Sequence, residues 1–302
     1  MEEASAYHLP VLLQEVITNL QIQPDGVYVD ATFGGGGHSR AILEKLNENG
    51  RLIVFDQDED AYNNRIDDPR VTFVQQNFRH LQRFLRLYKS VPVDGILADL
   101  GVSSWQFDTA ERGFSTRFDG DLDMRMDKRN ALTAASLLQS STEKELHLLF
   151  QNYGEVTNAR TLAKTIVQER KARPMRTINE FKSVIQPIVK GNPQKYLAQV
   201  FQALRIVVND EFGALKDMLN QSAEVLKPGG KLAIITFHSL EDRLVKNFMK
   251  TGQFEAQEDT FSYETPPKLF RLVTKKPVTA SPEELKRNTR SRSAKLRVAE
   301  KI

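Results

Sequence analysis

Residues 29–39 read Val-Asp-Ala-Thr-Phe-Gly-Gly-Gly-Gly-His-Ser, so four consecutive glycines, at 34–37, follow a short apolar run that begins at Val27. Glycine adopts positive φ angles and lets a ligand approach the backbone without a side chain in the way. In open α/β sheets, ligands lie beyond the carboxyl ends of the strands. This stretch therefore predicts the first strand of such a sheet, with a ligand site in the loop at its end.

Outward from this stretch, apolar runs rich in Val and Ile alternate with helical patterns. This alternation predicts βαβ units and a parallel sheet that is covered on both faces. The predicted strands are residues 27–32, 51–56, 71–74, 93–100 and 231–237, with two further candidates near 270–275 and 295–300.

The middle of the chain has a different pattern, because no convincing strand occurs between about 107 and 205. Thr and Glu three residues apart indicate helix starts by the capping-box pattern. These signals are the pairs Thr142/Glu145 and Thr177/Glu180, and two more helical patterns cover 158–170 and 194–208. We expect one doubly wound α/β domain, residues 1–106 and 207–302, interrupted by an all-helical substrate-recognition domain, residues 107–206.

Composition narrows the classes of protein further. The 302 residues are 40% apolar and 27% charged, which is typical of a globular protein. The chain has no cysteine, which excludes disulfide frameworks, cysteine zinc sites, iron–sulfur clusters and cysteine nucleophiles. There is no apolar run of membrane-spanning length, and the acidic residues 1–5 do not resemble a signal peptide. We therefore expect a cytoplasmic protein.

Charge is unevenly distributed along the chain. Residues 268–302 carry eleven Lys and Arg against three Glu, a balance of +8, so the remainder of the +3 chain is at −5. Arg287, Arg290 and Arg292 stand just before the last predicted strand and can bind phosphates. The segment predicts either a polyanionic partner or a solvated, solubilising surface.

The glycine loop does not match the common nucleotide motifs. Ser39 stands where the dinucleotide fingerprint needs its last glycine, and no Walker sequence follows. Asp30, at the end of the first strand, disfavours a pyrophosphate but suits a cationic ligand. These features favour S-adenosylmethionine, whose sulfonium is positive. A nicotinamide dehydrogenase on a similar sheet is the alternative enzyme.

Three later strand ends supply further candidate contacts. Asp56 ends the second strand, where a carboxylate accepts hydrogen bonds from ribose hydroxyls, whereas Asp58 fits a helix cap better. Phe78 follows the third strand and is either an adenine contact or a core residue. Asp99 ends the fourth strand and faces the reacting group. The Asp/Asn-Pro-Pro-aromatic tetrad of many amine methyltransferases is absent there, since Leu100 follows Asp99.

Several motifs together resemble one family over nearly the whole chain. They are HLPVLLQEV (8–16), DATFGGGGHS (30–39), DGILADLGVSSWQFD (94–108), ERGFS (111–115), LDMRMD (122–127), FQALRIVVNDE (201–211), FHSLEDR (237–243) and RSRSAKLRVAE (290–300). This set is similar to the bacterial MraW/RsmH family, S-adenosylmethionine-dependent enzymes that methylate N4 of a cytosine in the decoding centre of 16S ribosomal RNA. The family more often has an Arg among the loop glycines and a Pro where Trp105 stands.

The resemblance implies a class I, Rossmann-like methyltransferase sheet, S-adenosylmethionine as cofactor, and 16S ribosomal RNA, within the small ribosomal subunit, as partner. It implies cofactor contacts at Gly36, Gly37, His38, Asp56, Phe78, Asp99 and Gln106. His38 makes such a contact through either its side chain or its backbone. We expect Asp99 to be the catalytic polar group nearest the reacting atoms, although its carboxylate could bind the methionine amino group instead.

No metal site is expected. Asp119, Asp121 and Asp123 alternate as in a calcium loop, but the required Gly and Glu are missing, and the histidines are scattered. A non-catalytic RNA-binding assembly factor that kept the fold is the alternative from another class of protein.

Overall fold

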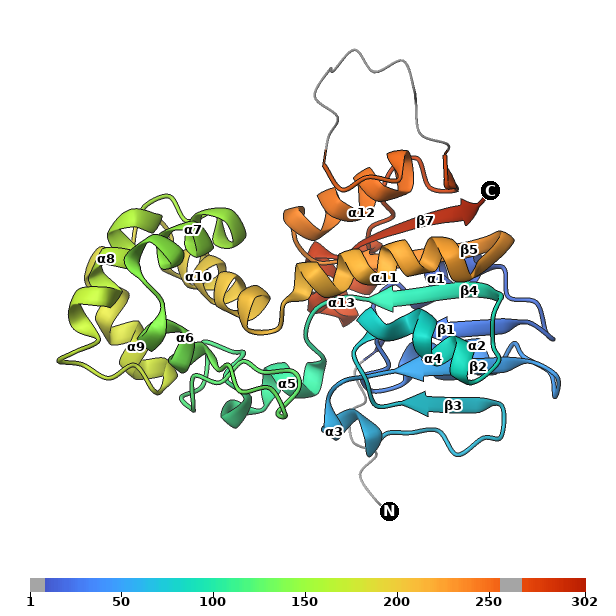
Figure 1. Ribbon diagram of the computed structural model, residues 1–302, viewed down its shortest axis with the longest axis horizontal. Coiled ribbons are helices and arrows are strands. Elements are labelled where there is room, and N and C mark those ends of the chain that lie inside the picture. The colour runs from blue at the N-terminus through green and yellow to red at the C-terminus, as the bar shows by residue number, and fades with distance from the viewer. Residues whose placement is uncertain (1–8, 256–267) are drawn as a thin grey trace, which may run out of the picture. The chain divides into compact units, whose positions relative to one another are not determined.

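The computed structural model describes residues 9–255 and 268–302, and the chain divides into two compact units. Met1–Gly101 and Gly213–Ile302 form the first, which we call the sheet unit; Val102–Phe212 form the second, the helical unit. The elements of both are labelled in Figure 1. The acidic residues 1–5 and His8 of the first motif lie outside the described residues.

The sheet unit contains a seven-stranded sheet in the order β3-β2-β1-β4-β5-β7-β6. The strands are β1 Val27–Asp30, β2 Arg51–Phe55, β3 Val71–Val74, β4 Val93–Asp99, β5 Leu226–Thr236, β6 Phe270–Leu272 and β7 Lys295–Lys301. The first five are parallel, and β7 runs antiparallel between β5 and β6. This confirms the predicted parallel sheet and both candidate strands near the carboxyl end of the chain.

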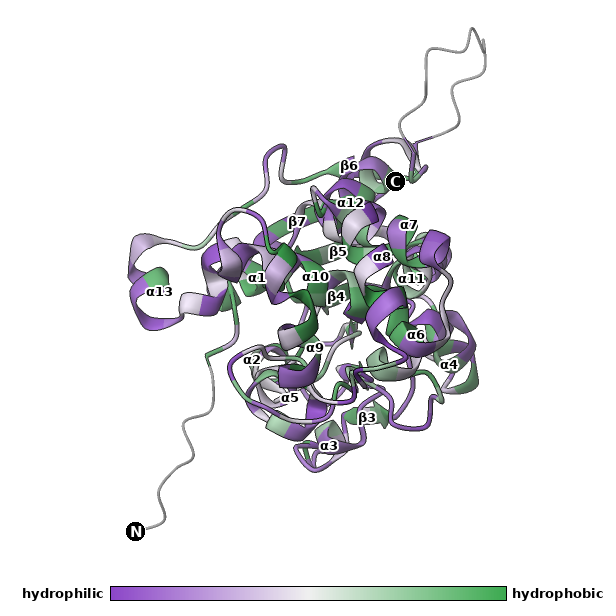
Figure 2. Cartoon of the chain, turned by 90° about the vertical axis from the view of Figure 1, so that its left-hand side faces the viewer, coloured by the Kyte–Doolittle hydropathy of each residue, from purple (hydrophilic) through white to green (hydrophobic). Residues whose placement is uncertain are grey.

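Both faces of the sheet are buried, because alternate residues of each strand join two different hydrophobic clusters. In β2, Ile53 and Phe55 belong to one cluster, while Leu52 and Val54 belong to the other. Strands β4 and β5 are accordingly coloured as apolar in Figure 2. The helices in or entering this unit are α1 Leu13–Leu20, α2 Gly37–Leu43, α3 Glu59–Tyr62, α4 Leu81–Leu87, α11 Glu211–Val225, α12 Ser239–Thr251 and α13 Pro282–Arg287.

The helical unit has its own core, which includes Leu146, Phe150, Phe181 and Leu204. Its helices are α5 Ser104–Asp108, α6 Ala134–Ser140, α7 Glu143–Gly154, α8 Ala159–Glu169, α9 Ile178–Ile185 and α10 Pro193–Val208. The two predicted capping boxes are confirmed at the starts of α7 and α9, and the two further helical patterns at α8 and α10. Among the described helices of the whole chain, none is long and apolar enough to span a bilayer.

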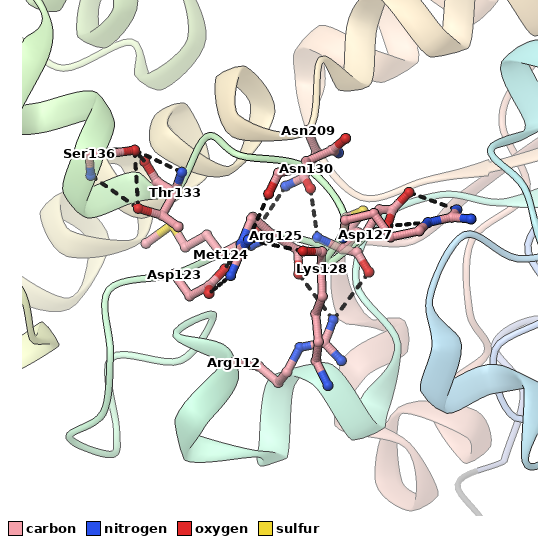
Figure 3. A network of polar contacts seen from close by, with 12 residues as sticks. Arg112, Asp123, Met124, Arg125, Asp127, Lys128, Asn130, Thr133, Ser136 and Asn209 are labelled. Carbon is pink, nitrogen blue, oxygen red and sulfur yellow. Dashed lines mark hydrogen bonds and ion pairs between the residues drawn. The ribbon is translucent and has the colours of Figure 1, made fainter.

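A hydrogen-bonded loop before α6 contains Asp123, the last of the three alternating acidic residues (Figure 3). Arg125 binds both carboxylate oxygens of Asp123, at 2.8 and 2.7 Å, and donates to the carbonyls of Lys128 and Asn130. Arg112 donates to the carbonyls of Arg125 and Met126. Asp123 therefore holds the loop together through Arg125, and no group of three metal-ligating side chains occurs in the described chain.

Candidate functional site

Strands β1 to β4 are parallel, so their carboxyl ends meet at one edge of the sheet. Strand β1 lies between β2 and β4, which makes the space beyond β1 and β4 the point where the strand order reverses. Ligands of doubly wound sheets bind at such points. The polar residues Asp30, Asp56 and Asp99 come at or just after the ends of β1, β2 and β4.

The four glycines differ in what they do. Gly36 has φ +73° and caps α2, and a Cβ there would lie 2.8 Å from the Phe33 ring and from the Arg40 guanidinium. At Gly37 a Cβ would meet the Pro10 ring at 3.0 Å. At Gly35 nothing lies within 4 Å. The fold itself therefore requires glycine at 36 and leaves little room for a side chain at 37, whereas Gly35 leaves an open face of backbone.

Asp56 holds this loop in place. Its Oδ2 accepts a hydrogen bond from the Gly34 N–H at 2.8 Å, and its Oδ1 accepts one from the Asp58 N–H at 2.9 Å. Asp58, as expected, caps α3 by accepting from the Asp60 N–H. Burial raises the pKa of Asp56 to about 6 despite these two bonds. Each oxygen still has a lone pair that can accept from a ligand hydroxyl.

Asp99 has an unused acceptor. Among the described residues, its buried Oδ1 has no hydrogen-bond partner, and its Oδ2 lies 3.8 Å from His38 Nδ1. Thr32 positions the strand end, because its Oγ1 accepts from the Asp99 N–H at 2.6 Å. The pKa of Asp99 is raised to about 6, mainly by burial; His38 lowers it, and the charges of Asp30 and Glu241 add to the rise.

The side chain of His38 is used within the fold. The ring is buried, and its Nε2 lies 2.9 Å from the carbonyl oxygen of Val11, so Nε2 carries the donated proton. The lone pair of Nδ1 then faces Asp99. The side chain joins α2 to the segment before α1, which leaves the backbone of His38 as the part available to a cofactor.

Asp30, the acid at the end of β1 that suits a cationic or amino-acid ligand, is hydrogen-bonded within the protein. Its side chain is only 1% exposed, and it accepts from the Ser39 hydroxyl at 2.6 Å and the Thr32 N–H at 3.1 Å. Burial raises its pKa. Asp30 therefore ties β1 to α2, a role that its place in the motif did not reveal.

The other two predicted contact residues belong to other elements. Phe78 opens the short 3₁₀ helix Phe78–His80 and is half-buried against the sheet core. Gln106 belongs to the helical unit, where it forms a capping box with Ser103 at the start of α5. The structure brings Gly36, Gly37, His38, Asp56 and Asp99 together at one edge of the sheet. Cofactor contacts by all seven residues stay predictions.

Sequence reasoning missed Thr32 and Arg40 as parts of this site. Thr32 anchors the Asp99 backbone, and Arg40 Nη1 donates to the Gly35 carbonyl at 2.6 Å. Both residues lie in or directly after the glycine motif. The sequence shows only that two polar side chains flank the glycine loop. It does not show their hydrogen-bond partners, because the partner of Thr32 lies at the end of β4 and that of Arg40 depends on the conformation of the loop.

A sheet of this order, with a glycine loop after β1 and carboxylates after β2 and β4, defines a class I S-adenosylmethionine-dependent methyltransferase. The chain belongs to the MraW methylase family, whose profile it matches over residues 5–302. This match confirms the resemblance drawn from the motifs, and with it the fold class, the enzyme class and the methyl donor. The nicotinamide dehydrogenase alternative is wrong.

Curated relatives are similar over their full length. The ribosomal RNA small subunit methyltransferase H of Bacteroides thetaiotaomicron is 55% identical over 296 residues, covering 98% of this chain and 97% of that protein. The protein of the same name from Flavobacterium johnsoniae is 50% identical over 303 residues and all of both chains. Among solved structures, a putative rRNA methylase from Clostridium thermocellum is 13% identical, with a TM-score of 0.45, over 97% of this chain and 99% of that one.

Proposed function

We propose that this enzyme transfers a methyl group from S-adenosylmethionine to the exocyclic N4 of a cytosine in the decoding centre of small-subunit ribosomal RNA, in the cytoplasm. The relatives named for small-subunit ribosomal RNA support the substrate class. The +8 balance of residues 268–302 supports a polyanionic substrate. The helical unit, residues 102–212, would recognise the RNA, and the sheet unit would carry the reaction.

The residues present fit the methyl donor. Asp56 offers two carboxylate oxygens to the ribose hydroxyls, and the open backbone at Gly35 admits the ligand beside it. The donor supplies an electrophilic methyl group on a positively charged sulfur. The uncompensated Oδ1 of Asp99 is a buried acceptor at the same edge, and it is the single observation that carries the proposal.

The amine of cytosine is a weak nucleophile, because its lone pair is delocalised into the ring. An acceptor that binds an N–H of N4 stabilises the amine in the form whose lone pair is localised on the nitrogen. Alignment of N4 with the methyl group of the donor lowers the remaining part of the activation barrier. Asp99 has a pKa of about 6, so at pH 7.5 its carboxylate is mostly ionised and able to accept. N4 lies on the Watson–Crick edge, so the base must be unpaired or turned out of its helix.

Asp99 has a second possible role, which is to bind the amino group of the methionine portion. The substitution Asp99→Asn separates the two roles. If Asp99 acts on N4, the variant keeps its affinity for S-adenosylhomocysteine and loses kcat. If Asp99 binds the amino group, the affinity for S-adenosylhomocysteine falls first.

Transfer of a tritiated methyl group to small ribosomal subunits that lack the modification tests the function. Nuclease digestion and mass spectrometry then identify the labelled nucleoside. N4-methylcytidine from the decoding centre supports the proposal. A label on another base overturns the assigned specificity, and no label favours the non-catalytic assembly factor.

A further inference from the structure

A pocket of about 230 Å³ lies on the sheet unit, where β5 ends and β7 begins. It is smaller than the usual pocket for a drug-sized ligand, which starts at about 300 Å³. Its lining combines cations and hydroxyl groups: Phe237, His238, Ser239, Thr279, Arg292, Ser293, Ala294 and Lys295. None of the residues that line it was assigned to the cofactor or to the reacting amine.

One cation of the pocket, Arg292, has no partner among the described residues, and the other, Lys295, shares an acid with Arg297. Arg292 is exposed, and no described residue makes a hydrogen bond or an ion pair with it. Lys295 Nζ lies 3.5 Å from Asp242 Oδ2, whereas Arg297 holds both oxygens of Asp242 at 2.6 and 3.1 Å. Glu241, the other nearby acid, is buried and accepts from the Phe237 N–H. Both acids are thus engaged. Arg292 remains available to an anion, and Lys295, which only shares Asp242 with Arg297, adds positive charge beside it.

The remaining polar groups are hydrogen-bond donors. Ser239, Thr279 and Ser293 are exposed, and their hydroxyls have no hydrogen-bond partner among the described residues. Ser239 is also the first residue of the 13-residue helix α12, whose N-terminal N–H groups favour anions. Two cations and three hydroxyls from three separate segments match an anion with several acceptor oxygens, which is the chemistry of a phosphate.

The pocket lies at the same edge of the sheet as Asp99. Asp99 is paired with Ile235 of β5, and the next residue of β5, Thr236, is paired with Lys295 of β7. Two strand spacings, about 10 Å, therefore separate the end of β4 from the start of β7. Glu241, in the first turn of α12, lies close enough to affect the charge of Asp99.

We propose that this pocket binds a phosphodiester group of the RNA, next to the nucleotide that is methylated at Asp99. This proposal rests on the proposed function, because it assumes an RNA substrate. The proposal also gives different roles to Arg290 and Arg292, the two arginines closest to the start of β7. Arg290 is half-buried and makes contacts within the chain, so Arg292 is the cation of this segment that faces the pocket.

The test compares Arg292→Gln with Lys276→Gln. Lys276 is an exposed cation of the same segment that does not line the pocket, so both variants lose one charge. Binding to small ribosomal subunits is measured over a range of salt concentrations. We expect Arg292→Gln to bind at least fivefold more weakly and to flatten the log–log salt slope by about 0.7 to 0.9. Lys276→Gln should change neither quantity appreciably.

Three further readouts make the test specific. Arg292→Lys should recover most of the affinity, because it restores the charge. Arg292→Gln should raise KM for the subunit while kcat and the affinity for S-adenosylhomocysteine stay unchanged, which also shows that the variant is folded. Lys295→Gln should reproduce the effect of Arg292→Gln on the salt slope.

The outcomes for the two proposals are separable. If Arg292→Gln behaves like Lys276→Gln in affinity and slope, the phosphate site is overturned, even when the wild-type enzyme methylates the subunit. If the wild-type enzyme transfers no methyl group but binding still depends on Arg292, the phosphate site stands and the proposed reaction falls.

Discussion

The carboxyl groups of Asp56 and Asp99 are held in the fold at a cost to its stability. Burial raises the pKa of each from 3.8 to about 6, so the folded chain binds these protons more tightly than the unfolded chain does. The preferential binding of these two protons by the folded chain therefore stabilises it fully below about pH 4. This stabilisation is lost as the pH rises through 6. Each ionised group costs on the order of 3 kcal/mol at neutral pH.

This cost predicts that Asp99→Asn stabilises the ligand-free enzyme. The variant removes the charge of a carboxyl group whose Oδ1 is buried, and it keeps the size of the side chain. We expect the free energy of unfolding in urea to rise by about 1–3 kcal/mol at pH 7.5. The gain should largely disappear at pH 3.5, where the carboxyl group is protonated in both the folded and the unfolded wild-type chain. A gain of equal size at both pH values would contradict the role of the charge.

The same two groups predict a pH dependence of ligand binding. S-Adenosylhomocysteine needs the ionised form of each carboxylate that it contacts. Its affinity, measured by calorimetry, should therefore be constant above about pH 7 and fall about tenfold per pH unit below 6 for each such carboxylate. Asp56→Asn should bind weakly and lose part of this dependence. An affinity that does not change between pH 7.5 and 5 would show that neither carboxylate contacts the ligand.

At the scale of elements, the loop between β1 and α2 combines two kinds of glycine. Gly36 is required by its positive φ and by the close approach of Phe33 and Arg40, and Gly37 is packed tightly against Pro10. Gly35 has no such neighbour. A substitution at Gly36 thus disturbs the loop itself, and only Gly35 reports on the ligand alone.

We therefore expect Gly35→Val to weaken the binding of S-adenosylhomocysteine at least tenfold, because the new side chain occupies the face that the ligand approaches. The unfolding temperature should stay within about 2 °C of the wild type, since the Cβ enters open space. Gly36→Ala is the matched control and should lower the unfolding temperature. Normal ligand affinity in Gly35→Val would place the ligand elsewhere.

At the scale of the whole molecule, the basic residues and the predicted cofactor contacts lie in different parts of the chain. The basic segment 268–302 contributes the pocket residues Thr279, Arg292 and Lys295, while most of the predicted cofactor contacts lie at or just after the ends of β1, β2 and β4. The affinity for small ribosomal subunits should therefore fall linearly with the logarithm of salt concentration, with a slope of several units. The affinity for S-adenosylhomocysteine should change less than twofold over the same range. Equal salt dependence of both would contradict this division.

The sequence by itself determined the features that depend on local pattern. The apolar runs placed the strands, and the parallel arrangement then put Asp56 and Asp99 at the same edge. The Thr and Glu spacings placed the starts of α7 and α9, because a capping box closes within four residues. The glycine run located the loop, because backbone freedom is a property of the residues themselves.

Only the tertiary structure decided which of these polar groups are free. Asp30 and Asp99 both end strands, yet Ser39 and Thr32 satisfy the carboxylate of Asp30, while Oδ1 of Asp99 has no partner among the described residues. The phosphate pocket likewise exists because β7 is inserted antiparallel beside β5, which pairs Thr236 with Lys295 across 59 positions. Such pairings depend on long-range packing, and no local pattern contains them.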